Sequence, residues 1–213
     1  MNDIDRKLSR YLNYRQGFFI EAGANDGYSQ SNTFYLEKKK GWRGILVEAI
    51  PELCQKCLKE RKRSAVYNFA LVSGEYREPK LVIHYANLMS AAQGAFKTEE
   101  ALRQHIRKGL MIQDIKESYA IELPVRTLES ILDEQADLPE IDLLSLDVEG
   151  YELEVLKGMN IEKYTPRYIL VEARYFEEVH GFLKDRYALV DRFSEHDYLY
   201  RSKIFGDNFH AAL

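Results

Sequence analysis

The chain has 213 residues, the size of one globular domain, and its 46% hydrophobic and 30% charged residues exclude an intrinsically disordered chain. Thirty-four acidic against thirty basic residues leave a formal charge of −4, which disfavours nucleic acid as a partner. Apolar runs are too short for a membrane span, and residues 1–5 lack the features of a secretory signal. Two cysteines are too few for a disulfide framework, so we expect one cytoplasmic domain over residues 1–213.

The first third of the chain alternates short apolar runs with longer amphipathic segments, after an N-terminal helix expected within residues 1–16. Strands are expected in residues 18–22, 44–48 and 65–70. Helices are expected between them, in residues 29–40 and 51–61. The basic run at residues 61–63 is interpreted as a complement to the negative end of the second helix. This alternation indicates parallel crossovers in an open α/β sheet.

The middle of the chain breaks this alternation. Strand-like runs at residues 80–85 and 119–125 flank a charged helix at residues 98–108. We interpret residues 86–118 as an insertion or lid on the substrate side, above the carboxyl edge of the sheet. The remaining elements are a helix at 127–134, a buried strand at 141–147, a short helix near 153–159, a strand at 168–172 and an antiparallel hairpin formed by 187–193 and 198–202.

The turn after the first strand is the first candidate site, because ligands of open α/β sheets bind outside the carboxyl ends of the strands. It carries Glu21, Gly23, Ala24, Asn25 and Asp26. The segment lacks the Gly-x-Gly-x-x-Gly pattern of a dinucleotide site, and its two carboxylates would repel a pyrophosphate. S-adenosylmethionine fits better, because it is cationic and has no phosphate. A glycine turn with solvated acids is the alternative.

Five further residues, at the ends of two strands, extend this candidate site along the sheet edge. Glu48, with Ala49 beside it, ends the second strand, where a carboxylate can accept hydrogen bonds from ribose hydroxyls. The third strand ends at Asn68, Phe69 and Ala70, where side chains can flank an adenine ring. We therefore assign both groups to cofactor binding.

Carboxylates at two later strand ends are the catalytic candidates. Asp147 ends the strand expected beside the first, close to Glu149 and Glu172. Mutual repulsion can raise the pKa of one acid until it serves as a base for the proton of an acceptor hydroxyl. Asp147 is also assigned to the cofactor site. Two alternatives stay open: the three acids chelate Mg²⁺ or Mn²⁺, or they only cap helix N-termini.

The sequence resembles the FkbM family of S-adenosylmethionine-dependent methyltransferases. The resemblance rests on residues 19–29, 41–48 and 146–158, of which the last is the most specific, and it extends through residues 169–172. One departure is Glu21, where such families more often have Asp. The resemblance implies a Rossmann-like, mostly parallel seven-stranded sheet with helices on both faces and a C-terminal antiparallel hairpin.

The function implied by the resemblance is O-methylation of a sugar, polyketide or other small molecule or glycan. The alternatives are an NAD(P)-binding Rossmann oxidoreductase of similar topology and a non-catalytic binding protein with the same fold. Whether the chain forms a homodimer is left open.

Overall fold

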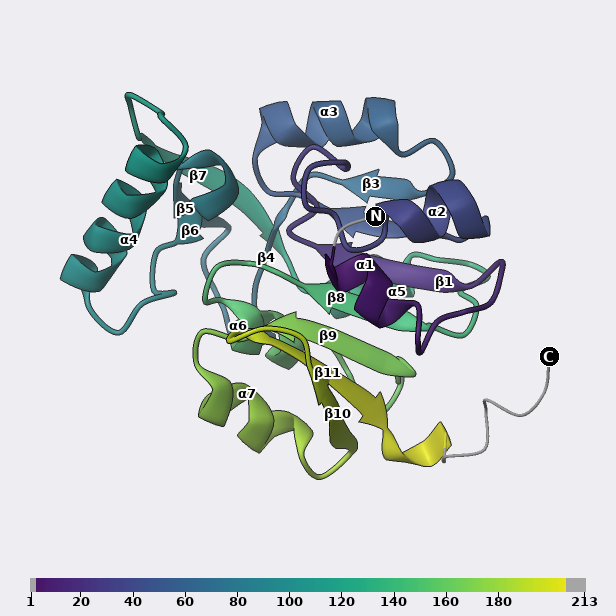
Figure 1. The fold of residues 1–213 in the computed structure, drawn as a ribbon. Helices are drawn as coiled ribbons and strands as arrows, with labels where there is room; N and C mark the ends of the chain where they lie inside the picture. The colour runs from purple at the N-terminus through teal and green to yellow at the C-terminus, as the bar shows by residue number, and fades with distance from the viewer. Residues whose placement is uncertain (1–2, 206–213) are drawn as a thin grey trace.

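A mostly parallel sheet of seven strands forms the centre of the computed structural model, which describes residues 3–205. Its strands are β1 (Phe18–Ala22), β2 (Arg43–Val47), β3 (Ala65–Tyr67), β8 (Leu143–Leu146), β9 (Tyr168–Glu172), β10 (Tyr187–Arg192) and β11 (Asp197–Ser202). They lie in the order β10-β11-β9-β8-β1-β2-β3, and β11 pairs antiparallel with both neighbours (Figure 1). The expected fold class, including the C-terminal antiparallel hairpin, is confirmed.

Helices cover both faces of this sheet because its central strands are apolar on both sides. Ile20 and Leu144 point to one face, where they pack in a core with α5 (Leu128–Asp133), α6 (Glu152–Lys157) and α7 (Phe176–Leu183). Phe19 and Leu143 point to the opposite face, which is covered by α1 (Asp3–Leu8), α2 (Phe34–Lys40) and α3 (Pro51–Glu60). Strand residues therefore alternate between two helical layers, and the central strands are fully buried.

A second, four-stranded sheet follows β3 and lies beside the main sheet (Figure 1). It consists of β4 (Ala70–Leu71), β5 (Lys80–His84), β6 (Ala91–Ala92) and β7 (Ala120–Arg126), in the order β4-β7-β5-β6. The short helix η1 (Asn87–Met89) and the helix α4 (Glu99–Ile112) belong to the same unit. Leu102 and Ile106 of α4 pack on Ala86 and Ala91. The segment expected as an insertion thus has a small apolar core of its own.

Three elements are shorter than the expected ranges, and side-chain contacts account for two of them. The N-terminal helix within residues 1–16 is the six-residue α1, and residues 1–2 lie outside the described part. The helix expected over residues 29–40 begins only at Phe34, because residues 31–33 bind the carboxylate of Glu21 instead. The strand expected over residues 65–70 ends at Tyr67, where the amide of Asn68 turns back to the carbonyls of Glu48 and Ala49.

Candidate active site

A cavity of about 350 Å³ lies at the carboxyl ends of the main-sheet strands, within the range of about 300–1,000 Å³ of small-molecule sites. Most of the predicted site residues line it: Glu21, Gly23, Asn25, Glu48, Ala49, Phe69, Ala70, Asp147, Glu149 and Glu172. The opposite wall comes from the second sheet, η1 and the end of α4, and it includes Leu81, Ile83, Met89, Ile112 and Gln113. The expected insertion therefore does reach the site.

Gly23 brings the loop after β1 close to the end of β8. Its φ is +82°, and a Cβ atom at this position would lie 1.7 Å from the backbone oxygen of Asp147. On the other side, the Gly23 and Ala24 amides donate to the carbonyl of Val47 at 3.0 and 3.2 Å. Glycine is required here because the backbone conformation is left-handed and the space is filled. The loop is thus fixed between two strand ends, with its backbone facing the cavity.

Glu48 is held rigidly at the end of β2. Its Oε2 accepts a hydrogen bond from the Asn25 amide at 2.7 Å, and its Oε1 accepts one from the Ile50 amide at 2.8 Å. Burial, with 6% of the residue exposed, raises the pKa of Glu48 to about 7 despite these two bonds. A carboxylate has about four acceptor positions, so the side chain keeps acceptor capacity for ligand hydroxyls.

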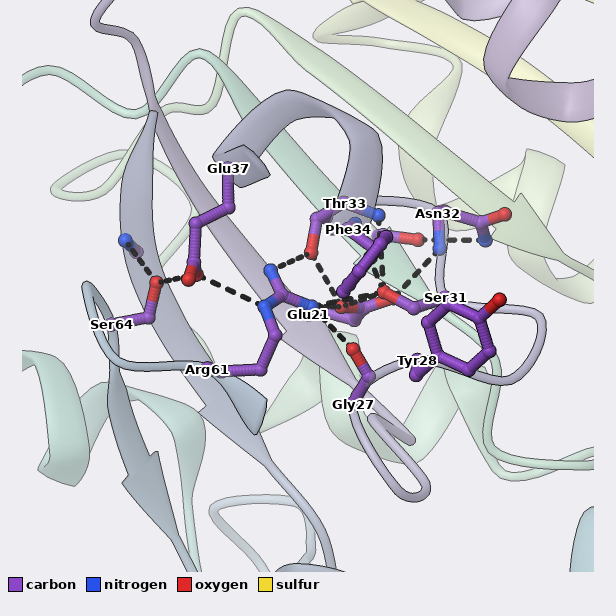
Figure 2. A network of polar contacts seen from close by, with 12 residues as sticks. Glu21, Gly27, Tyr28, Ser31, Asn32, Thr33, Phe34, Glu37, Arg61 and Ser64 are labelled. Atoms are coloured by element: carbon purple, nitrogen blue, oxygen red, sulfur yellow. Dashed lines mark hydrogen bonds and ion pairs between the residues drawn. The ribbon is translucent and has the colours of Figure 1, made fainter. Parts of the chain in front are cut away.

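Glu21 lies beneath the loop in a buried network around Arg61 (Figure 2). Its carboxylate accepts hydrogen bonds from the Asn32 amide at 2.9 Å and the Thr33 hydroxyl at 2.5 Å, and both oxygens lie within 3.0 Å of the Ser31 hydroxyl. Arg61 lies 3.4 Å from the same carboxylate through Nη1 and 3.0 Å from that of Glu37 through Nε.

The guanidinium of Arg61 also binds the loop itself. It donates to the Gly27 carbonyl, the Ser31 hydroxyl and the Thr33 hydroxyl at 3.2, 3.0 and 2.7 Å. The sequence analysis interpreted residues 61–63 as a complement to the negative end of a helix; Arg61 does follow α3 directly, but its side chain is fully buried and binds the loop and two carboxylates. Glu21 and Arg61 together set the shape of residues 27–33.

Four carboxylates gather where β8 and β9 end. The pKa of Asp147 is raised well above its ordinary value by burial and by the negative charges of Glu172, Glu149 and Glu152. Burial likewise raises the pKa of Glu149 and of Glu152 to about 7. Glu152, which the sequence analysis did not single out, accepts bonds from the amides of Val148 and Gly150 at 3.2 and 2.8 Å. Glu152 therefore shapes the loop that presents Asp147.

Glu149 joins this loop to the insertion. Its Oε2 lies 3.3 Å from Nη2 of Arg174 and 3.4 Å from Nε2 of His105 in α4. Nε2 of His105 also lies 3.1 Å from the Met89 carbonyl, and Nδ1 lies 3.2 Å from Arg174. Burial and the charge of Arg174 lower the pKa of His105 to about 4, so the ring is neutral near pH 7. Arg174 and His105 were not predicted from sequence.

Three residues predicted to bind the cofactor do not line the cavity. Ala24 is buried in the core beside α2. Asp26 accepts bonds from the amides of Tyr28 and Ser29 at 2.9 and 2.7 Å, and these bonds lower its pKa. Asn68 donates to two backbone carbonyls at 2.8 and 2.7 Å. All three shape the loops of the site.

The chemistry of the lining fits S-adenosylmethionine. Several carboxylates line a cavity that has no phosphate-binding glycine pattern, and a cationic ligand without phosphate suits such a lining. A metal site is less well supported: within residues 3–205, no group of three or more His, Cys, Asp or Glu side chains is placed so that it could hold a metal ion. Nor is any helix in this range long and apolar enough to cross a membrane.

The fold and the cavity define an α/β protein with a cavity of small-molecule size at the carboxyl ends of a Rossmann-like sheet. The family model of the FkbM methyltransferase domain matches residues 21–201. The chain therefore belongs to this family and is an S-adenosylmethionine-dependent methyltransferase. This assignment favours the methyltransferase interpretation over the NAD(P)-dependent oxidoreductase.

Solved structures of other methyltransferases resemble this chain. A TehB-like SAM-dependent methyltransferase from Corynebacterium glutamicum has a TM-score of 0.48 and 10% identity, covering 95% of this chain and 89% of that one. A SAM-dependent methyltransferase from Aquifex aeolicus has a TM-score of 0.47 and 11% identity, covering 94% and 88%. An RNA methyltransferase from Salinibacter ruber in complex with S-adenosyl-L-homocysteine has a TM-score of 0.45 and 13% identity, covering 95% and 90%. A search of curated proteins gave no significant match.

Proposed function

We propose that the protein methylates a hydroxyl group of a small molecule or glycan, with Asp147 as the group that receives the hydroxyl proton. One observation carries this proposal: Asp147 lies in the same cavity as the Glu48 and Gly23 cofactor residues and as the wall built by the insertion. A carboxylate between a cofactor site and a variable wall is placed where an acceptor and its proton would meet.

The chain's residues have separate tasks in this reaction. Glu48 binds the ribose hydroxyls, and Phe69 and Ala70 flank the adenine. The cofactor supplies an electrophilic methyl group on a sulfonium. Asp147 would receive the proton of the acceptor hydroxyl as the hydroxyl oxygen takes the methyl group, with S-adenosylhomocysteine as the leaving group. Glu149 and Glu172 raise the proton affinity of Asp147 through their charges.

The wall formed by the insertion favours a small organic acceptor. Its lining combines apolar side chains such as Leu81, Ile83 and Met89 with the polar side chains of Asn87, Ser90 and Gln113. Acids at the opposite side, together with the net charge of −4, would repel a polyanion. A sugar, polyketide or related alcohol therefore fits this lining better than a nucleic acid. The cytoplasmic location stays a prediction.

The test is transfer of a labelled methyl group from S-adenosylmethionine to a panel of sugars, sugar-containing glycans and polyketide alcohols, with RNA as a comparison. We expect label on a hydroxyl oxygen of a small acceptor, detected by mass spectrometry and located by NMR. Transfer to RNA alone, or to nitrogen or carbon, would contradict the proposal.

The same assay separates the base and metal alternatives. If Asp147 acts as a plain base, EDTA leaves turnover unchanged; if the acids bind Mg²⁺ or Mn²⁺, EDTA abolishes turnover and the ion restores it. The geometry of the described residues supports the plain base, so we expect turnover to resist the chelator.

A further inference from the structure

Asn32 carries a buried polar atom that the fold leaves without a partner. Its Oδ1 has no hydrogen-bond partner within residues 3–205, although only 7% of the residue is exposed and it lines the cavity. The rest of the residue is fixed: Nδ2 donates to the hydroxyl of Ser145 at 3.1 Å, and the backbone amide donates to Glu21 at 2.9 Å. Buried carbonyl oxygens are normally satisfied, so this one is placed for a donor that comes from outside the chain.

The position of Asn32 along the sheet indicates which part of a ligand it meets. Glu48 directly follows β2, and Phe69 and Ala70 lie beyond β3. A cofactor with its ribose at Glu48 and its adenine between Phe69 and Ala70 therefore extends from β2 toward β3 at its adenine end. Its other end then lies over β1 and β8. Ser145, the partner of the Asn32 amide, stands opposite Glu21 in the register of these two strands. The amino-acid end of the cofactor reaches this place.

Glu21 is the obvious candidate for binding the ammonium group, but its acceptor positions are largely filled. Ser31, Thr33, the Asn32 amide and Arg61 already surround its two oxygens, as Figure 2 shows. A ligand cation would have to compete with the permanent charge of Arg61. The Oδ1 atom of Asn32 has no such competitor.

We propose that Asn32 Oδ1 accepts a hydrogen bond from the methionyl ammonium of S-adenosylmethionine. This inference rests on the cofactor orientation given in the proposed function, with the ribose at Glu48. Glu21 then acts through Asn32, because it holds the backbone amide of that residue and thereby orients its side chain. Ser145 fixes the amide plane so that the oxygen faces the ligand.

The test measures calorimetrically how the Asn32→Ala variant binds two ligands: S-adenosylhomocysteine and its deaminated analogue, which has hydrogen in place of the amino group. We expect a loss of about 10- to 150-fold for S-adenosylhomocysteine, the range for deleting a hydrogen bond to a charged group. Affinity for the deaminated analogue should change less than about twofold. Ser202→Ala is the matched control, since its hydroxyl is also buried without a partner but lies outside the cavity.

Two binding results would overturn the inference. Equal losses for the two ligands would mean that Asn32 only maintains the loop or binds the carboxylate, and no loss would mean that it makes no contact. If Asn32→Ala does not fold, Ser145→Ala provides the second variant, and its loss should again be larger for the amino-bearing ligand. Wild-type protein that fails to bind S-adenosylhomocysteine would refute the cofactor site itself. Selective loss without methyl transfer to any hydroxyl would refute only the proposed reaction.

Discussion

Replacing Arg61 with Met tests whether one buried cation holds the cofactor loop. Methionine keeps much of the side-chain volume but removes the charge and all guanidinium hydrogen bonds. Glu21 and Glu37, which are 3% and 2% exposed, would then be buried carboxylates without their cation. Gly27, Ser31 and Thr33 would each lose a hydrogen bond that now fixes the loop. The loss should therefore affect stability and cofactor binding together.

The magnitude follows from the uncompensated charge. Removing one partner of a buried ion pair costs about 3–5 kcal/mol of unfolding free energy, because the remaining charge stays desolvated. For a chain of this length, each kcal/mol corresponds to about 2–4 °C in melting temperature, so we expect a decrease of about 6–20 °C. Arg61→Lys should lose less, because it keeps the charge but not the planar set of donors.

Urea unfolding of the wild type and of Arg61→Met measures this loss directly. We expect a lower midpoint at an unchanged slope, accompanied by weaker binding of S-adenosylhomocysteine. Arg63→Met is the matched control, because that exposed arginine makes one long bond of 3.4 Å to the Gly41 carbonyl. Adding Glu37→Gln to Arg61→Met should recover part of the loss. If Arg61→Met is as stable as Arg63→Met, the argument from buried charge is refuted.

Three further predictions concern the cavity. Glu48→Ala should weaken binding of S-adenosylhomocysteine by about 1.5–3 kcal/mol in calorimetry without unfolding the protein, and unchanged affinity would exclude a ribose contact. Because burial raises the pKa of Glu48 to about 7 from 4.5, its stabilising contribution is fully present below about pH 4.5 and is lost as the pH rises through about 7. The urea midpoint of cofactor-free Glu48→Gln should therefore fall less than that of the wild type between about pH 5 and 8, and parallel curves would contradict this. Asp147→Asn should lower kcat by about 10²- to 10⁴-fold with little change in cofactor affinity, whereas lost affinity with normal turnover would make Asp147 a binding residue only.

The main sheet could be predicted because its strands are short, continuous apolar runs. The sequence of residues 18–22 predicts β1 with its observed bounds, and α2 ends where expected, at Lys40. The start of α2 could not be predicted, because Ser31 and Thr33 are residue types that cap helices but here bind Glu21 at the end of β1. The two-residue strands β4 and β6 were missed, because such short strands are defined by their partners and not by their own pattern. Helix α7 was missed as well.

The strand-end residues of the site were predictable for a topological reason. Carboxyl ends of parallel strands meet at one edge, so Glu48 and Asp147 could be placed together without knowledge of the loops. The sequence indicated that residues 86–118 lie on the substrate side, but not which side chains form the wall, because antiparallel pairing of β5 with β7 brings together segments more than 35 residues apart. Arg61 illustrates the same limit. A basic run after a helix is typical of a solvated surface, and only the tertiary contacts of Arg61 show that it is buried while Lys62 and Arg63 are exposed.

The two walls of the cavity are attached to the fold in different ways, and this difference bears on specificity. The loop after β1 is fixed by the fully buried Arg61, which binds two carboxylates and three groups of residues 27–33. The wall formed by η1 and α4 meets the Asp147 loop through the contacts of Glu149 with His105 and Arg174. Glu149, which makes these contacts, follows Asp147 by two positions in the sequence. If the proposed acceptor site is right, side chains of η1 and α4 can change to suit another acceptor while the loop after β1 keeps its shape. Glu149 links the position of that wall to the negative charge around Asp147.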